Sequence, residues 1–156
     1  MAETTEFDQA SADRIISRHI GTPGAMLPIL HALQDEFGCV PEQAVPMVAH
    51  ALNLSRAEVH GVVTFYHDYH RTRPGAHVLK LCQAEACQSN GCRELASHVR
   101  DRLGIELGAT TADGRVTLEA VYCLGLCAVG PSAMLDGKLL GRVNAARMDR
   151  LLEALA

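Results

Sequence analysis

Four cysteines form two closely spaced pairs in the second half of the chain. Four residues separate Cys82 from Cys87, and three separate Cys123 from Cys127 within the run YCLGLCAVGP. Thiolate sulfur binds zinc and iron strongly, and it is also the nucleophile of thiol–disulfide exchange. The two pairs are therefore the first candidates for chemistry, as a metal centre, as redox-active thiols or as plain buried residues.

The spacing within each pair bears on the kind of metal. Structural zinc favours a Cys-x2-Cys turn, which aims both sulfurs at one small ion. A two-iron cluster is larger and takes two thiolates on each iron, so wider loops suit it. Gly125 and Gly130 flank Cys127, where backbone N–H groups can approach a negative cluster, and the apolar Leu124 and Leu126 would keep water off the sulfurs. A [2Fe–2S] cluster is favoured, with zinc or metal-free thiols as alternatives.

Both pairs lie at the ends of predicted strands. The stretches His77–Cys82 and Val116–Cys123 are rich in branched and apolar residues. If these strands are neighbours in one sheet, the loops that follow them meet at one edge, and four sulfurs can converge there. A hairpin turn at Asp136-Gly137 and a last helix capped by Asn144 complete a small α/β layer fold.

The two remaining cysteines are expected to be structural. Cys92 begins the spacing of three, four and four residues that continues with Leu95, Val99 and Leu103, which places it on the buried face of a helix. A buried cysteine of this kind behaves as a small hydrophobic residue. Cys39 ends a helix in the other half of the chain and is expected to be inert.

The first half of the chain predicts a helical bundle. Expected helices cover residues 8–20, 26–37 and 41–52, and a fourth begins at Ser55, which forms a capping box with Glu58. The residues expected on their buried faces are Ile15, Ile16, Ile20, Met26, Leu30, Leu33, Phe37, Val45, Val48, Leu52, Val59, Val62, Val63 and Tyr66. The polar run HRTRPGAH separates the two halves, so we expect a helical domain over residues 1–72 and a second domain over 76–156.

The composition argues against several classes of protein. The 156 residues suffice for one domain or two small ones, and 48% of them are hydrophobic, so a packed core is expected. A formal charge of −4 and an aromatic content of 4% disfavour nucleic-acid binding. No apolar stretch approaches the ~20 residues of a membrane-spanning helix.

Motifs that the sequence lacks argue against further classes of function. The acidic N-terminal stretch MAETTEFDQASADR lacks the hydrophobic segment of a secretory signal, so we expect a cytoplasmic protein with reduced thiols. No dinucleotide-binding glycine loop follows a strand, and there is no nucleophile elbow. We therefore expect no catalytic site in this chain and no NAD or flavin bound by it.

A second polar cluster lies at the end of the first half. His60, His67 and His70 have a spacing that would suit one side of the fourth helix, but no carboxylate or cysteine joins them at ligand spacing. The overlapping segment TFYHDYH is a candidate docking surface, with ordinary packing of Phe65, Tyr66 and Tyr69 as the alternative.

The cysteine pattern also resembles that of a known family. The Cys-x4-Cys pair, 35 intervening residues and then CLGLCAVGP are similar to the thioredoxin-like [2Fe–2S] ferredoxins, which include the small iron–sulfur subunit of complex I and related subunits of NAD-linked hydrogenases and formate dehydrogenases. The stretches LPILHALQDEFGCVP and LSRAEVHGVVTFYHDY resemble the helical N-terminal region of that family. The resemblance implies an α+β fold, in which an N-terminal helical bundle precedes a thioredoxin-like α/β ferredoxin domain.

The resemblance also implies a ligand set and a function. Carried over, the ligands of the [2Fe–2S] cluster are Cys82, Cys87, Cys123 and Cys127. The stretch HVLKLCQAEACQ is most similar to the gamma subunit of NAD-dependent, molybdenum-containing formate dehydrogenase. The implied role is electron transfer beside a flavin- and NAD-binding diaphorase subunit and a molybdenum-containing catalytic subunit.

Three alternatives stay open at this point. The chain has the features of an equivalent subunit of complex I or of an NAD-linked hydrogenase. It also has those of a zinc-stabilised interaction module without a redox role. A thiol oxidoreductase is the third, although the Cys-x2-Cys motif of thioredoxins is absent.

Overall fold

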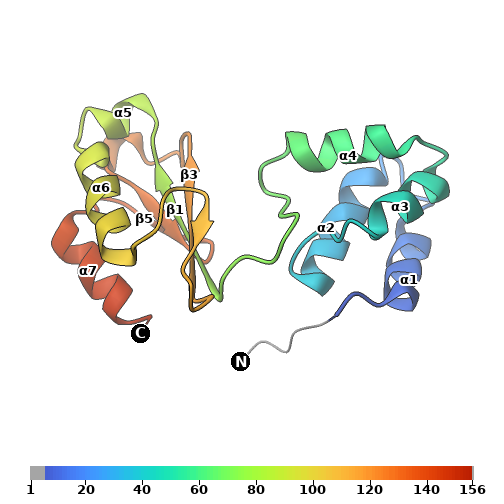
Figure 1. The fold of residues 1–156 in the computed structure, drawn as a ribbon. Coiled ribbons are helices and arrows are strands. Elements are labelled where there is room, and N and C mark those ends of the chain that lie inside the picture. The colour runs from blue at the N-terminus through green and yellow to red at the C-terminus, as the bar shows by residue number, and fades with distance from the viewer. Residues whose placement is uncertain (1–5, 156) are drawn as a thin grey trace. The chain divides into compact units, whose positions relative to one another are not determined.

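The computed structural model describes residues 6–155 and divides the chain into two compact units (Figure 1). The first unit extends to Arg73 and the second begins at Pro74. Each unit has its own hydrophobic core. Among the described residues, no helix has both the length and the hydropathy needed to cross a membrane.

The first unit consists of helices connected by short loops. They are α1 (Gln9–His19), α2 (Met26–Phe37), α3 (Ala44–Leu52) and α4 (Arg56–Phe65). The side chain of Asp8 caps α1 by accepting hydrogen bonds from the N–H groups of Ala10 and Ser11. The capping box predicted at the start of α4 is confirmed, because Ser55 and Glu58 each bond the backbone N–H of the other.

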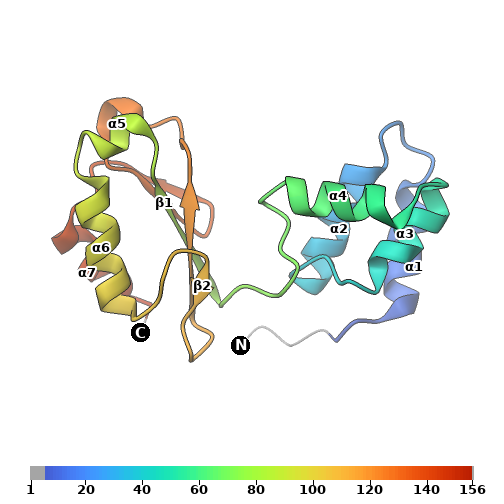
Figure 2. The same ribbon diagram turned by 45° about the horizontal axis from the view of Figure 1, so that its top comes forward.

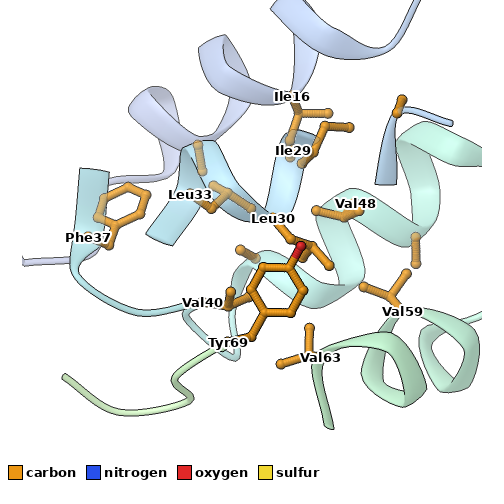
Figure 3. Close-up of a cluster of buried hydrophobic side chains, with 14 residues drawn as sticks. Ile16, Ile29, Leu30, Leu33, Phe37, Val40, Val48, Val59, Val63 and Tyr69 are labelled. Atoms are coloured by element: carbon orange, nitrogen blue, oxygen red, sulfur yellow. The ribbon is translucent and has the colours of Figure 1, made fainter. Parts of the chain in front are cut away.

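The core of the first unit draws on all of its helices and on the segment after α4 (Figure 3). Its larger members are Ile16, Ile29, Leu30, Leu33, Phe37, Val40, Val48, Val59, Val63 and Tyr69. The ring of Tyr69 is buried, and its hydroxyl donates a hydrogen bond to the Leu27 carbonyl oxygen at 3.3 Å. The apolar spacings in the sequence thus predicted most of this core.

Three expectations for this unit are wrong in detail. The third helix begins at Ala44 and not at Pro41, because Pro41 belongs to a turn whose carbonyl oxygen accepts from the Ala44 N–H. Ile20 is 47% exposed because it caps α1, where the chain turns away. Tyr66 is 46% exposed because α4 ends at Phe65 and its backbone is already extended.

The second unit is built on a mixed five-stranded sheet. Its strands are β1 (His77–Cys82), β2 (Ala109–Thr110), β3 (Val116–Val121), β4 (Ala133–Leu135) and β5 (Lys138–Leu140), in the order β2-β3-β1-β4-β5. β1 and β3 are parallel, and β4 lies antiparallel on the other side of β1. The predicted turn at Asp136-Gly137 connects β4 to β5, and both of its residues have positive φ angles, which favour this tight hairpin.

Helices cover one face of this sheet. The helical elements are α5 (Glu85–Gln88), α6 (Cys92–Leu103), the 3₁₀ helix η1 (Cys127–Val129) and α7 (Ala145–Glu153), and both views show α6 and α7 on the same face (Figures 1 and 2). Leu79, Leu118 and Met148 lie fully buried between the sheet and these helices. As predicted, the Asn144 side chain caps α7 by accepting from the Arg147 N–H. The expected α+β fold, a helical bundle followed by an α/β unit, is confirmed.

The register of the central strands sets the position of the cysteines. Cys82, the last residue of β1, pairs with Val121, the last residue of β3. Both strands therefore end at the same edge of the sheet, as expected. The predicted second strand was too long, however, because Tyr122 is 79% exposed and Cys123 has a φ of 112°, which an extended strand does not allow.

Candidate metal centre

The first cysteine pair is buried at the end of β1. Cys82 and Cys87 are each 2% exposed, and α5, which carries Cys87, starts three residues after the strand. The turn between them is held by backbone hydrogen bonds from the N–H groups of Cys87 and Gln88 to the Ala84 carbonyl oxygen. Gln83 and Ala84 thus connect the strand to the first turn of α5, which returns the second sulfur toward the first.

The second pair lies on the short loop after β3 and is exposed. The sulfurs of Cys123 and Cys127 are 3.6 Å apart, and the Gly125 N–H lies 3.4 Å from the Cys123 sulfur as a donor. Two sulfurs bound to one tetrahedral metal at about 2.3 Å are roughly 3.8 Å apart. The separation observed here is close to that value, so this pair is already spaced for a single metal atom.

The two pairs come together because η1 packs against α5. The pKa of the Cys127 thiol is raised, first by its hydrogen bond with Cys123 and by the charge of that sulfur, then by burial and by the charges of Cys87 and Cys82. Charges interact this way only at short range, so the sulfurs of both loops lie in one electrostatic environment. The structure thus places the loop of the second pair beside the first pair, and the role of the four sulfurs as ligands stays a prediction.

The environment of Cys82 favours a thiolate. Burial alone raises the pKa of this thiol, but hydrogen bonds from the N–H of Ala84, from Cys87, from the Ser132 hydroxyl and from the N–H of Leu124 bring the pKa below its usual value. Because the thiolate is the form that binds metals, these donors prepare the sulfur for ligation.

The arrangement fits a two-metal cluster better than a single ion. One cysteine pair is buried and the other is exposed, and each supplies two sulfurs, which is the number that each iron of a [2Fe–2S] cluster takes. The zinc alternative, which needs four ligands around one ion, is correspondingly disfavoured.

The expectation that apolar neighbours keep water away from the second cysteine pair is wrong. Cys123 and Cys127 are exposed. Leu124, which was expected to keep water away from them, packs instead against the buried group formed by Cys82, Cys87 and Cys92. The loop therefore shields the first pair and leaves the second at the surface.

The third cysteine of the buried group is Cys92, the first residue of α6. Its 2% exposure confirms the prediction that it lies on the buried face of that helix. Its sulfur lies 3.8 Å from the side-chain oxygen of Gln83, and burial raises the pKa of its thiol. Its place on the buried face of α6, with Leu95 and Val99, supports a packing role.

One polar residue at this site was missed by the sequence analysis. Ser132 is 2% exposed, its hydroxyl oxygen is 3.4 Å from the Cys87 sulfur, and its carbonyl oxygen accepts the Cys82 N–H at 3.0 Å. The available signal was the serine that begins the hairpin segment SAMLDGKLLGRV. Its proximity to the cysteines depends on the pairing of β4 with β1, which local sequence does not reveal.

The three histidines at the end of the first unit are not aligned on one helix, and a docking role for TFYHDYH stays a prediction. Because α4 ends at Phe65, His67 and His70 lie beyond the helix that was expected to align them with His60. The His70 N–H donates to the Gln34 side-chain oxygen at 2.7 Å, so this segment is attached to α2. The aromatic residues of this segment differ in burial, since Tyr69 is buried while Phe65 is 72% exposed.

Comparisons with known proteins agree with this geometry. The family described as thioredoxin-like [2Fe-2S] ferredoxin matches residues 12–156. A component of the NADH-quinone oxidoreductase of Pseudomonas aeruginosa is 33% identical over 96% of this chain and 90% of its own length. The corresponding component of the Escherichia coli K12 enzyme is 32% identical over 97% of this chain and 94% of its own. The NADP-reducing hydrogenase subunit HndA of Solidesulfovibrio fructosivorans is 30% identical over 83% of this chain and 75% of its own.

A solved structure supports the fold independently. A chain of an NAD⁺-reducing [NiFe]-hydrogenase in the air-oxidised state superposes with a TM-score of 0.71 and 28% identity over 88% of this chain. The present chain spans 24% of that longer one. The sequence matches, the fold and the position of the cysteine pairs agree with one another. The chain belongs to the thioredoxin-like [2Fe–2S] ferredoxin family, whose cofactor is a [2Fe–2S] cluster and whose role is electron transfer.

Proposed function

We propose that this chain holds its cluster through Cys82, Cys87, Cys123 and Cys127 and works as the electron-transfer subunit of an NAD-dependent formate dehydrogenase. The observation that carries the ligand assignment is the meeting of a buried and an exposed cysteine pair at one edge of the sheet. When bound, the cluster supplies one-electron chemistry.

The protein's own residues would position and stabilise that cluster. The parallel pairing of β1 with β3 holds the two loops side by side. The N–H groups of Ala84, Leu124 and Gly125 donate to cysteine sulfurs and so stabilise their negative charge. The exposed pair leaves one side of the site open, which suits electron exchange with a partner.

The choice of formate dehydrogenase rests on the stretch HVLKLCQAEACQ, which forms β1, the following turn and α5. This stretch resembles the gamma subunit of the molybdenum-containing, NAD-dependent enzyme. The relatives named above belong to complex I and to a hydrogenase, and an equivalent subunit of either is the alternative. All three assemblies need the same contribution from this chain.

The proposed partners are a diaphorase subunit that binds flavin and NAD, and a molybdenum-containing subunit that oxidises formate to carbon dioxide. The sequence of this chain has no dinucleotide-binding glycine loop, so the nicotinamide and the flavin belong to the partner in this proposal. Free cysteines and a cluster of this kind suit a reducing compartment such as the cytoplasm.

Purification with native partners tests the assignment. The tagged chain, isolated without air from its own cells, is expected to bring down a flavoprotein and a molybdenum protein and to show formate-dependent reduction of NAD. A nickel-containing partner would replace the proposal with a hydrogenase, and a partner with neither metal would point to complex I. Iron and sulfide analysis of the separated chain tests the cluster itself, and a colourless, iron-free chain contradicts it.

A further inference from the structure

A single buried hydroxyl lies among the proposed ligands. Ser132 and Thr117 are the buried polar residues of the part of the chain that the structure describes, and Ser132 alone of the two is next to cysteine sulfurs. The Ser132 oxygen is 3.4 Å from the Cys87 sulfur, and the hydroxyl is also a hydrogen-bond partner of the Cys82 sulfur. This hydroxyl therefore faces the buried pair.

The sheet holds Ser132 in this place. It directly precedes β4, whose first residue, Ala133, pairs with Leu81 of β1. The next step of that ladder is the hydrogen bond from the Cys82 N–H to the Ser132 carbonyl oxygen at 3.0 Å. Backbone pairing thus fixes Ser132 opposite Cys82, so its side chain is positioned before any metal binds.

The chain just before Ser132 also lies close to the Cys87 sulfur. Gly130 lies two residues before Ser132, and a Cβ atom on Gly130 would lie 3.4 Å from the Cys87 sulfur. The stretch before β4 therefore lies next to α5, the helix that carries Cys87. Cys82, Cys87 and Ser132 are each 2% exposed, so water does not compete for the hydroxyl.

Ligation decides the direction of the hydrogen bond. Between a free thiol and a hydroxyl, either atom can donate. A metal-bound thiolate has no proton and only accepts, so the Ser132 hydroxyl becomes the donor. A donor to a ligand sulfur stabilises the more negative, reduced form of a cluster more than the oxidised form.

We infer that Ser132 is a positioning residue that tunes the cluster, its hydroxyl donating a hydrogen bond to the ligand sulfur of Cys87 and so raising the reduction potential. The inference rests on the proposed function, because it takes Cys82 and Cys87 as ligands. It assigns the tuning to a side chain outside the ligand set. Removing the hydroxyl leaves all four sulfurs in place.

The test is a redox titration of the cluster-loaded full chain, wild type against Ser132→Ala. Ser132→Ala is expected to keep its iron and labile sulfide. At the wild-type midpoint its ratio of reduced to oxidised cluster is expected to fall about tenfold, which for one electron is a midpoint ~59 mV lower. Resonance Raman bands of the Fe–S(Cys) stretches are expected to move to higher frequency, because the sulfur loses a hydrogen bond.

Thr117→Val is the matched control. Thr117 is the other buried hydroxyl, 6% exposed, and it bonds the Gly75 N–H and Thr110 near the opposite end of β3. This variant loses a buried hydroxyl of the same sheet, and it is expected to keep the wild-type midpoint. An equal midpoint shift in Thr117→Val would show that general loosening of the sheet is responsible, and would overturn the inference.

The remaining outcomes separate this inference from the proposed function. An unchanged midpoint and Raman spectrum in a cluster-loaded Ser132→Ala protein would overturn the role of Ser132 and leave the ligands standing. A wild-type chain without iron and sulfide would overturn both. If Ser132→Ala fails to fold, Ser132→Thr and Ser132→Val, which have the same shape, decide the question, and equal midpoints in these two contradict the inference.

Discussion

The two cysteine pairs differ in how completely the folded protein buries and surrounds their sulfurs. Cys82 and Cys87 are buried, and the Ser132 hydroxyl and backbone donors surround their sulfurs. Cys123 and Cys127 are exposed on a loop that carries a single turn of 3₁₀ helix. The buried pair is part of a packed cluster of side chains, whereas the exposed pair is held by its own short loop.

This difference implies that the two pairs contribute differently to the proposed site. The buried pair is positioned by the sheet and by α5, so in the proposed assignment it is the packed half of the cluster site. The exposed pair needs only local backbone geometry, with the N–H of Gly125 donating to Cys123. It leaves the site accessible from outside. The predictions that follow test this contrast, from the largest expected effect to the smallest.

The largest effect is expected from removing a ligand in either pair. Cys87→Ser and Cys127→Ser are each expected to lose nearly all iron and labile sulfide, because three thiolates do not complete a four-thiolate cluster. Metal and sulfide analysis with visible absorption measures the loss. Full cluster content in Cys127→Ser would show that the exposed pair is not part of the site.

The next effect concerns the accessibility of the thiols once the metal has been removed by a chelator. Cys123 and Cys127 are expected to react with iodoacetamide at rates near those of free thiols, and Cys82 and Cys87 roughly a hundredfold slower. That factor corresponds to ~2.7 kcal/mol for the local opening that a buried thiol requires. Mass spectrometry of timed samples measures the rates, and circular dichroism verifies that the fold persists. Equal rates would remove the contrast between the pairs.

A smaller effect is expected from the third buried thiol. Cys92→Ala is expected to keep the whole cluster and to lower the free energy of unfolding by ~1 kcal/mol, because it removes a buried sulfur and leaves a small cavity. Urea denaturation and the visible spectrum measure the two quantities. Loss of the spectrum in this variant would mean that the ligand assignment is wrong.

The smallest effect concerns the contact between the helices behind the site. The hydrogen bond from His98, the charges of His98 and Arg102 and the hydrogen bond from Arg102 keep the pKa of the Asp149 carboxyl below its usual value, against the opposing effect of burial. A lowered folded-state pKa adds stability above the unfolded pKa of about 3.9, and this stability disappears as the pH falls through the folded value.

Asp149→Asn is therefore expected to destabilise the protein slightly at neutral pH and to match the wild type in strong acid. Urea denaturation at several pH values measures the difference in the free energy of unfolding between the two proteins. This difference should be small because the ion pair of Asp149 with His98 is at the surface. The cluster content should not change, since this contact connects α7 to α6 and does not reach the exposed cysteine pair. A destabilisation that persists in strong acid would contradict the assigned cause.

Local sequence patterns predicted much of the fold. The spacing of Leu30, Leu33 and Phe37 marked the buried face of α2, and the Asp136-Gly137 pair marked the hairpin. Errors gathered at the ends of elements, as at Ile20 and Tyr66, where a helix stops and the periodicity no longer places a side chain. The two-residue strand β2 was missed, because it is too short to show an alternating pattern.

For the site, the sequence by itself determined which sulfurs are available and that they follow strands, because the cysteine spacing and strand-forming residues are local properties. The ligand role of Cys82, Cys87, Cys123 and Cys127 stays a prediction. Only the tertiary structure decided that one pair is buried and the other exposed, and that Ser132 lies against Cys87. These facts depend on how β1 pairs with β3 and β4 and in what register. That pairing joins residues 39 or more positions apart through a shared core that no local pattern encodes.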